Sequence, residues 1–179
     1  MGKKLFKKTF ELAPEGTHPA IITSVADLGI QIENWKGQER RKSKWGIGFE
    51  LSGPKTSDGK PFSIATTVSD SLHPKSRLYP IIKATLGSVD NGLDMENILG
   101  KSVLITVEHT ERDDKTWANV ANVSGLPDGM TMEASDTPQL YFDLDEPDSA
   151  VYEKLPALFK KRIEARVETE HESTGDLPF

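Results

Sequence analysis

The sequence predicts a mainly β fold, a small five-stranded barrel with one helix between its third and fourth strands. Apolar and polar residues alternate at strict period two over residues 45–51, the pattern of a strand with one buried face. Over residues 78–86 the apolar spacing becomes helical, and from residue 103 the period of two returns. Gly, Pro and Asp residues typical of turns separate these segments. The pattern therefore indicates short strands joined by turns, with a single helical interruption.

Three strands come first. The β-rich run 17–25 continues into an alternating stretch up to residue 32, so we expect a long first strand that bends near Gly29. The second strand covers residues 45–51 and is followed by turn signals within residues 53–59. Residues 62–68 alternate again and form the third strand.

The helix follows the third strand. Leu78, Ile81 and Ile82 are spaced along one helical face, and Pro80 marks the start of the regular part. Gly87 stands where the residue after the helix adopts a left-handed conformation. A second, single turn is expected after this helix, with Asp94 as its N-cap.

Two more strands, over residues 103–107 and 117–123, complete the pattern, with a polar turn at residues 110–115 between them. The predicted elements follow one another in the order of the OB-fold, which is three strands, one helix and then two strands. This fold is a Greek-key barrel that binds oligonucleotides or oligosaccharides. Other small barrels have the same number of strands. We expect residues 15–125 to form this domain.

The remaining segments differ from the domain in composition. Residues 1–14 form a basic arm, residues 126–148 an acidic linker, and residues 168–179 an acidic tail without periodicity, which we expect to be disordered. Residues 149–167 have a helical pattern, in which Leu155, Phe159, Ile163 and Val167 fall four residues apart. This amphipathic helix packs either on the barrel or on a second subunit.

Composition excludes several classes of protein. The chain is 36% hydrophobic and has no apolar run of about 18 residues, so we expect no membrane span, and the N-terminus lacks the apolar segment of a signal peptide. The absence of Cys rules out disulfides and thiol catalysis and is compatible with a reducing cytoplasm.

Charge is distributed unevenly along the chain. Residues 1–125 hold 17 basic and 15 acidic residues, whereas residues 126–179 hold 5 basic and 13 acidic residues. This asymmetry favours a binding body with an interaction tail, although a solvated acidic end has the same composition.

The best candidate site is the segment 33–45 after the first strand. In an OB-fold this connection flanks the ligand groove. Binding of single strands needs cations for the phosphates and aromatic planes for the bases. The segment has five cations between two indoles, and its candidate residues are Trp35, Lys36, Arg40, Arg41, Lys42, Lys44 and Trp45. Trp45 shares the alternating face of the second strand, so it is either a core residue or a contact of the ligand.

Other candidates lie outside this segment. Trp117 begins the fifth strand beside the second connection that flanks the groove, and it is either a stacking residue or a core residue. Phe62 on the third strand and Lys75 and Arg77 before the helix are further candidates for nucleic-acid contacts. The basic arm is a possible clamp on the strand.

Catalytic patterns are absent from the sequence. The four His residues show no metal-ligand spacing, and only Asp143 and Asp145 hint at a divalent cation. We therefore expect no enzyme activity, no metal and no cofactor.

Several motifs resemble those of bacteriophage single-stranded DNA-binding proteins. They are residues 71–76 (SLHPKS), Asn119-Val120 with 126–130 (LPDGM), and 142–145 (FDLD) followed by Leu155-Pro156. The resemblance implies an OB-fold, binding of single-stranded DNA of any sequence, and a part in phage replication or recombination. It also implies a location in the cytoplasm of a bacterial host, and it leaves a homo-oligomer possible.

The last four residues resemble the tail tips of bacterial single-stranded DNA-binding proteins, which recruit replication and repair enzymes. In Asp176-Leu177-Pro178-Phe179 a basic rim on a partner would hold the carboxylates, and an apolar pocket would hold Leu177 and Phe179. The sequence thus favours a non-enzymatic DNA-binding protein. There are two alternatives. One is an adaptor whose main ligand is protein, and the other is a metal-dependent nuclease that uses Asp143 and Asp145.

Overall fold

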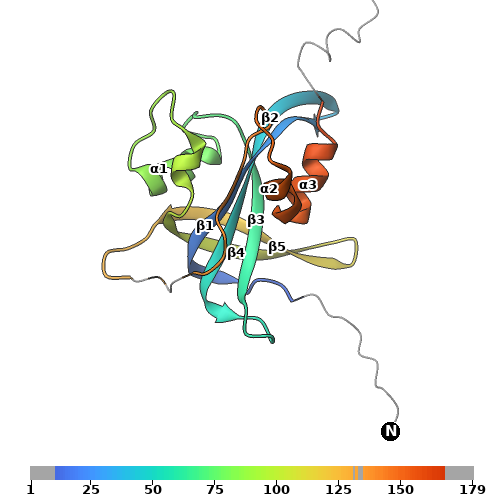
Figure 1. The fold of residues 1–179 in the computed structure, drawn as a ribbon. Helices are drawn as coiled ribbons and strands as arrows, with labels where there is room; N and C mark the ends of the chain where they lie inside the picture. The colour runs from blue at the N-terminus through green and yellow to red at the C-terminus, as the bar shows by residue number, and fades with distance from the viewer. Residues whose placement is uncertain (1–10, 131, 133–134, 168–179) are drawn as a thin grey trace, which may run out of the picture.

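The computed structural model describes residues 11–130, 132 and 135–167, and its fold is mainly β, as the sequence predicts (Figure 1). Most of the basic arm and the whole acidic tail, including residues 176–179, therefore lie outside the described residues. The strands are β1 (Gly16–Trp35), β2 (Gln38–Lys55), β3 (Pro61–Ser69), β4 (Ser102–Arg112), β5 (Lys115–Gly125) and β6 (Leu140–Phe142). The helices are α1 (Leu78–Leu86), the 3-10 helix η1 (Met95–Ile98), α2 (Ser149–Lys154) and α3 (Ala157–Glu164).

The sheet is built around β1. Its order is β3-β2-β1-β4-β5, with all these neighbours antiparallel, and the short β6 pairs in parallel with β1. In the described part of the chain no ladder joins β3 to β5, so the sheet is open and a closed barrel is not formed by backbone pairing. None of the helices in this part is long and apolar enough to span a bilayer.

The predicted bend of β1 is present at Gly29. The register between β1 and β2 shifts between Asp27 and Gly29, and Gly29 has a φ of +70°. A Cβ at this position would lie 2.9 Å from the Arg166 side chain. Glycine is therefore required both by the backbone conformation and by the close approach of the C-terminal segment.

Two apolar clusters occupy opposite faces of β1 and β2. The main core lies inside the curved sheet under α1 and includes Ile22, Val25 and Phe49. The second cluster, on the outer face, contains Ala26, Leu28, Phe142, Leu155, Phe159 and Ile163. β1 supplies both clusters because its side chains alternate between the two faces, and the register shift between Ile22 and Ser24 lets Ile22 and Val25 share the main core.

The C-terminal segment forms two helices where the pattern predicts one over 149–167. Asp148 caps α2 by accepting hydrogen bonds from the N–H groups of Ala150 and Val151. Leu155 then adopts an extended backbone before Pro156, because proline disfavours a helical residue in front of it. As predicted, Leu155, Phe159 and Ile163 are buried, and the partner they pack on is the sheet of the same chain. The acidic linker 126–148 also contains the strand β6.

Candidate nucleic-acid interface

The predicted loop 33–45 is mostly strand. β1 and β2 pair up to Trp35 and Gln38, and only Lys36 and Gly37 form the turn, with φ values of 49° and 78°. Two consecutive positive φ values are those of a two-residue hairpin turn whose twist matches that of the strands. The basic residues of this segment therefore lie on paired strands, β1 and β2, whose register fixes their positions.

The ladder separates the candidate residues into two faces. Because residues paired across antiparallel strands share a face, Trp35, Arg40, Lys42 and Lys44 lie on one face and Arg41 on the other. The Arg40 guanidinium carbon lies 3.7 Å from the centre of the Trp35 ring, and the Lys36 ammonium lies 4.4 Å from it. Trp35 is nevertheless 45% exposed. Its indole is thus an exposed aromatic surface surrounded by cations.

Glu33 lies on the same face and neutralises part of its charge. Its carboxylate accepts a hydrogen bond of 2.8 Å from Lys44 Nζ and lies 3.5 Å from Lys42 Nζ. The bond from Lys44 holds the pKa of Glu33 below its usual value. On the other face, Arg41 lies 3.7 Å from Glu39. The cation of the Lys42–Glu33 pair is exposed, and such pairs contribute little stability, so a phosphate can compete for Lys42.

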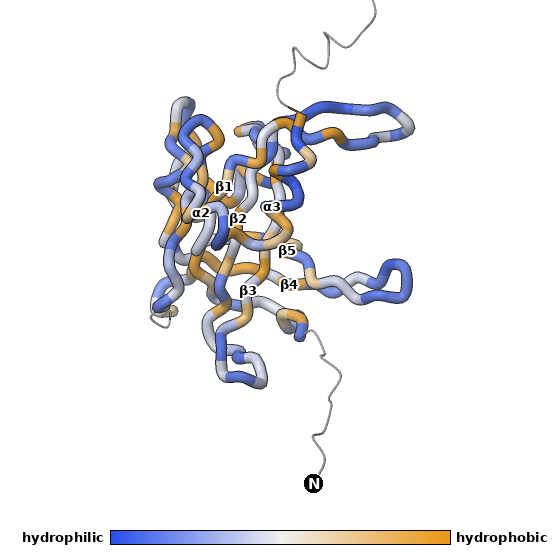
Figure 2. Tube along the Cα trace, turned by 45° about the vertical axis from the view of Figure 1, so that its right-hand side comes forward, coloured by the Kyte–Doolittle hydropathy of each residue, from blue (hydrophilic) through white to orange (hydrophobic). Residues whose placement is uncertain are grey.

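The β4–β5 hairpin is the second projecting element. Asp113 and Asp114, with φ values of 56° and 61°, form its turn, so the strands cover most of the predicted turn 110–115. Trp117 is 46% exposed, and the Arg112 guanidinium carbon lies 5.9 Å from the centre of its ring. Both hairpins are hydrophilic and project from the same side of the molecule, with α3 between them (Figure 2). The structure thus places one exposed indole on each of two hairpins that project from the same side.

The other candidates have different surroundings. Trp45 and Phe62 are partly buried and pack against the main core, while Lys75 is exposed in the turn before α1. The structure therefore brings Trp35 and its cations together but does not place Trp45 or Phe62 with them on an open surface. Gly46, which could have left the outer face of β2 open, is covered by the ring of Phe159.

Arg77 connects the two ends of the open sheet. Its guanidinium donates hydrogen bonds to the Thr67 carbonyl (3.1 Å) and the Thr66 hydroxyl (2.9 Å) on β3, and to the Val120 carbonyl (3.1 Å) on β5. The side chain thus bridges β3 and β5 at the place where no ladder joins them.

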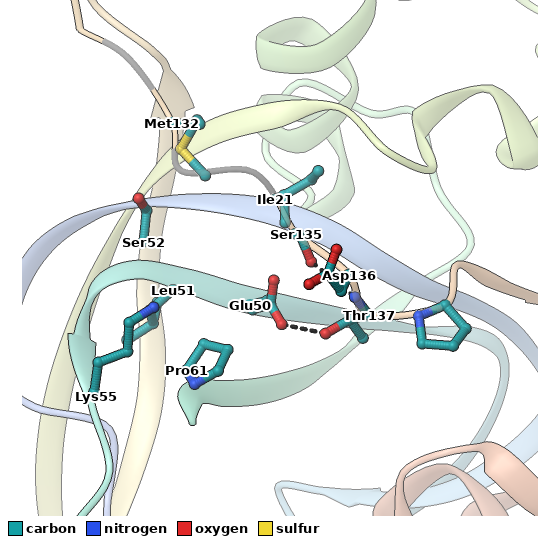
Figure 3. A pocket seen from close by; sticks show the side chains of 11 residues that line it. Ile21, Glu50, Leu51, Ser52, Lys55, Pro61, Met132, Ser135, Asp136 and Thr137 are labelled. Carbon is teal, nitrogen blue, oxygen red and sulfur yellow. Dashed lines mark hydrogen bonds between the residues drawn. The ribbon is translucent and has the colours of Figure 1, made fainter. Parts of the chain in front are cut away.

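A hollow of about 430 Å³ beside β2 has a different character. Figure 3 shows Glu50, Asp136 and Thr137 around it, and the buried Glu50 carboxylate accepts a hydrogen bond from the Thr137 hydroxyl. Two carboxylates repel a phosphate, although Lys55 also lines this hollow. It is therefore no part of the candidate interface.

Asp143, one of the two residues that hint at a divalent cation, takes part in a local backbone turn. The Asp143 carboxylate accepts a hydrogen bond of 2.9 Å from the backbone N–H of Asp145. Within residues 11–130, 132 and 135–167, no three acidic or His side chains lie close enough together to hold a metal ion.

The sequence predicts that the C-terminal helix packs on the barrel or on a second subunit, and it indicates no nucleic-acid contact from this helix. The structure places Leu158 and Arg162 of α3, together with Thr67 of β3, in hollows on the side from which the hairpins project. Their only signal in the sequence is the spacing of four residues between Leu158 and Arg162, on a helix whose other face is apolar.

No protein-family model matches the chain, and no curated protein matches it either.

Proposed function

We propose that this protein binds single-stranded DNA without sequence preference, through the two hairpins and the surface between them. The observation that carries the proposal is the pair of exposed indoles, Trp35 and Trp117, each beside an arginine on a hairpin that projects from the same side. A base of any kind stacks on such a ring with about 1–3 kcal/mol, and neighbouring cations bind the phosphates.

We infer that the fold is an OB-fold. The support is the sheet order β3-β2-β1-β4-β5, with a helix between β3 and β4. Further support is that Arg77 hydrogen-bonds to both β3 and β5, the two strands that would meet at the seam of such a barrel. In this fold the β1–β2 and β4–β5 connections flank the ligand groove, and they are the two hairpins that carry Trp35 and Trp117.

A role in phage replication or recombination, in the cytoplasm of a bacterial host, is the biological setting that we propose. It is supported by the motif resemblance of residues 71–76 and 126–130 to phage single-stranded DNA-binding proteins. Recruitment of replication proteins by Asp176-Leu177-Pro178-Phe179 rests on sequence alone, because these residues lie outside the described part.

Titration of a labelled oligo(dT) of about 16 nucleotides, near the upper limit of the site size of one OB-fold, tests the proposal. We expect fluorescence anisotropy to show binding that weakens with salt, with a log–log slope of about −0.7 per phosphate contact. Duplex DNA of the same length serves as the competitor. Equal affinity for duplex and single strand would contradict the proposal.

The adaptor without a nucleic-acid role is the alternative outcome of the same titration. An amphipathic helix that packs on a second subunit would favour this alternative, but the apolar residues Leu155, Phe159 and Ile163 are buried against the chain's own sheet. Absence of binding to oligo(dT) at about 50 mM salt, where electrostatic binding is strong, would favour the adaptor.

A further inference from the structure

Two neighbouring hollows between the hairpins have Thr67 as a common lining residue. The first, of about 220 Å³, lies at the base of the β1–β2 hairpin and is lined by Lys44, Thr67 and Arg162 among others. The second, of about 550 Å³, extends from Thr67 past Leu158 to Asn119 on β5. Because Thr67 lines both hollows, they are adjacent at β3, and we refer to the two together as the path.

α3 forms one side of this path and is held rigidly there. Phe159 and Ile163 are buried in the outer cluster. The Gln31 side-chain amide donates hydrogen bonds to the Arg162 carbonyl (2.7 Å) and the Leu28 carbonyl (2.8 Å), which fixes the end of the helix to β1. Leu158 and Arg162, one turn apart, therefore keep a fixed position beside the path.

The first hollow of the path carries positive charge that suits the phosphates of a single strand. Arg162 and Lys44 line it together with Glu33, whose carboxylate is already paired with Lys44 and Lys42. In the described part of the chain, no carboxylate lies within ion-pair distance of the Arg162 guanidinium. Its charge is available to a ligand. At the second hollow, Glu108 is acidic, and Leu158 offers a 37% exposed apolar surface.

We propose that α3 is a wall of the DNA-binding channel. Arg162 contacts a phosphate of the single strand, and Leu158 packs against a sugar or base as the strand crosses β3 between the hairpins. This inference rests on the proposed function and adds to it a set of binding residues from the C-terminal segment.

The test compares Arg162→Gln with Lys160→Gln in the full chain. Each variant removes one positive charge from α3, but the Lys160 ammonium lies 5.9 Å from the centre of the Tyr152 ring, on the side of α2. We expect Arg162→Gln to weaken oligo(dT) binding severalfold and to reduce the salt slope by about 0.7, the contribution of one phosphate contact. Lys160→Gln should leave both quantities as in the wild type.

The outcomes separate the two proposals. If wild-type protein does not bind oligo(dT), the proposed function fails. If wild-type protein binds but the two variants have the same affinity and slope, the α3 wall alone is wrong.

A second measurement does not depend on substitutions. Photo-crosslinking of the wild-type complex with oligonucleotides that contain 5-bromodeoxyuridine, followed by mass spectrometry, should identify the peptide with Leu158 and Arg162. Crosslinks confined to the hairpin peptides with Trp35 and Trp117 would overturn the inference.

Discussion

Trp35 and Trp45 belong to the same hairpin and face different surroundings. The Trp35 ring is exposed and has two cations within 4.4 Å of its centre, whereas Trp45 packs against the main core. A base that stacks on Trp35 must share or displace these cations, and we expect a displaced Arg40 to bind the phosphate of the same nucleotide. The contact would thus couple stacking to an ion pair at a single residue.

We predict that Trp35→Ala weakens oligo(dT) binding by about 1–3 kcal/mol and changes the free energy of unfolding by less than about 0.5 kcal/mol. The reason is that the exposed ring contributes to binding and not to the core. Trp45→Ala is the matched control, and it should reduce stability because it removes packed apolar surface. Anisotropy titration and urea denaturation measure the two effects. A Trp35→Ala variant with wild-type affinity would remove the main support for the binding surface.

Asp27 has a partly buried carboxyl group whose environment makes the stability of the fold depend on pH. Burial raises its pKa, the N–H of Gly29 opposes this rise, and repulsion from Asp143, Asp145 and Asp70 adds to it. A carboxyl whose pKa is higher in the folded state destabilises the fold while it is ionised, so this cost is present at neutral pH. The cost is relieved as the pH falls through the raised pKa towards 3.8, the ordinary value.

We therefore expect Asp27→Asn to be more stable than the wild type at neutral pH. The amide oxygen can still accept the hydrogen bond from Gly29, which is 2.9 Å long in the wild type. The advantage should shrink on acidification and disappear below the ordinary pKa of 3.8. Urea denaturation at several pH values measures the difference between the two proteins. If the difference in the free energy of unfolding does not change with pH, the effect of the substitution comes from packing and not from ionisation of Asp27.

At the scale of elements, alternation predicted the strands wherever one face is buried. The third strand, Gly87 after the helix and the Asp94 cap are found where the sequence places them, and the predicted second strand 45–51 is part of the longer β2. The helix starts at Leu78, two residues before Pro80, because proline is tolerated in a first helical turn. The hairpin ends were interpreted as loops because both of their faces are solvated. Strand pairing there depends on the turn and on the neighbouring strand, and it leaves no hydrophobic period in the sequence.

The outer layer depends on a close contact between Gly46 and Phe159. A Cβ at position 46 would lie 2.7 Å from two ring carbons of Phe159, whose side chain is fully buried. We predict that Gly46→Ala lowers the free energy of unfolding by about 1–3 kcal/mol, because the ring has to move out of a packed cluster. Gly125→Ala is the control, since no atom lies within 4 Å of the added methyl group. Equal stability of the two variants in urea would show that α3 shifts freely.

The bridge between β3 and β5 leads to a second prediction at this scale. Arg77→Met removes three hydrogen bonds to the two strands, so we expect a loss of about 1–2 kcal/mol in the free energy of unfolding. Lys75→Met, an exposed position two residues away, should change it by less than about 0.5 kcal/mol. If Arg77→Met also lowers the salt slope of oligo(dT) binding by about 0.7, Arg77 contacts a phosphate as well, as the sequence predicts.

At the scale of the whole molecule, the sequence identifies only part of the candidate surface. The cluster of Trp35 with Arg40 and Lys36 is local, so its composition is visible in the chain. Arg162 reaches the same side only because α3 packs on β1 and β2, more than a hundred residues earlier in the chain. Such a placement follows from tertiary packing and has no signature in a single sequence.

The separation of charge along the chain leads to a last prediction. Residues 168–179 hold four acidic residues and no Lys or Arg, and the proposed DNA surface is basic at Arg40 and Arg162. A negatively charged tail attached to a cationic surface competes with phosphates at low salt, and the competition is screened as the Debye length shrinks from about 10 Å at 0.1 M to about 3 Å at 1 M. Removal of residues 168–179 should therefore increase oligo(dT) affinity severalfold at low salt and have little effect at high salt.

The decisive comparison separates charge from the terminal motif. A full-length variant with Glu168, Glu170 and Glu172 changed to Gln retains residues 176–179, and it should reproduce most of the gain because the competition is electrostatic. Phe179→Ala keeps every charge and should leave the affinity for DNA unchanged at all salt concentrations. If Phe179→Ala instead raises affinity as much as the truncation does, the tail occupies the surface through its apolar tip, and the charge argument is wrong.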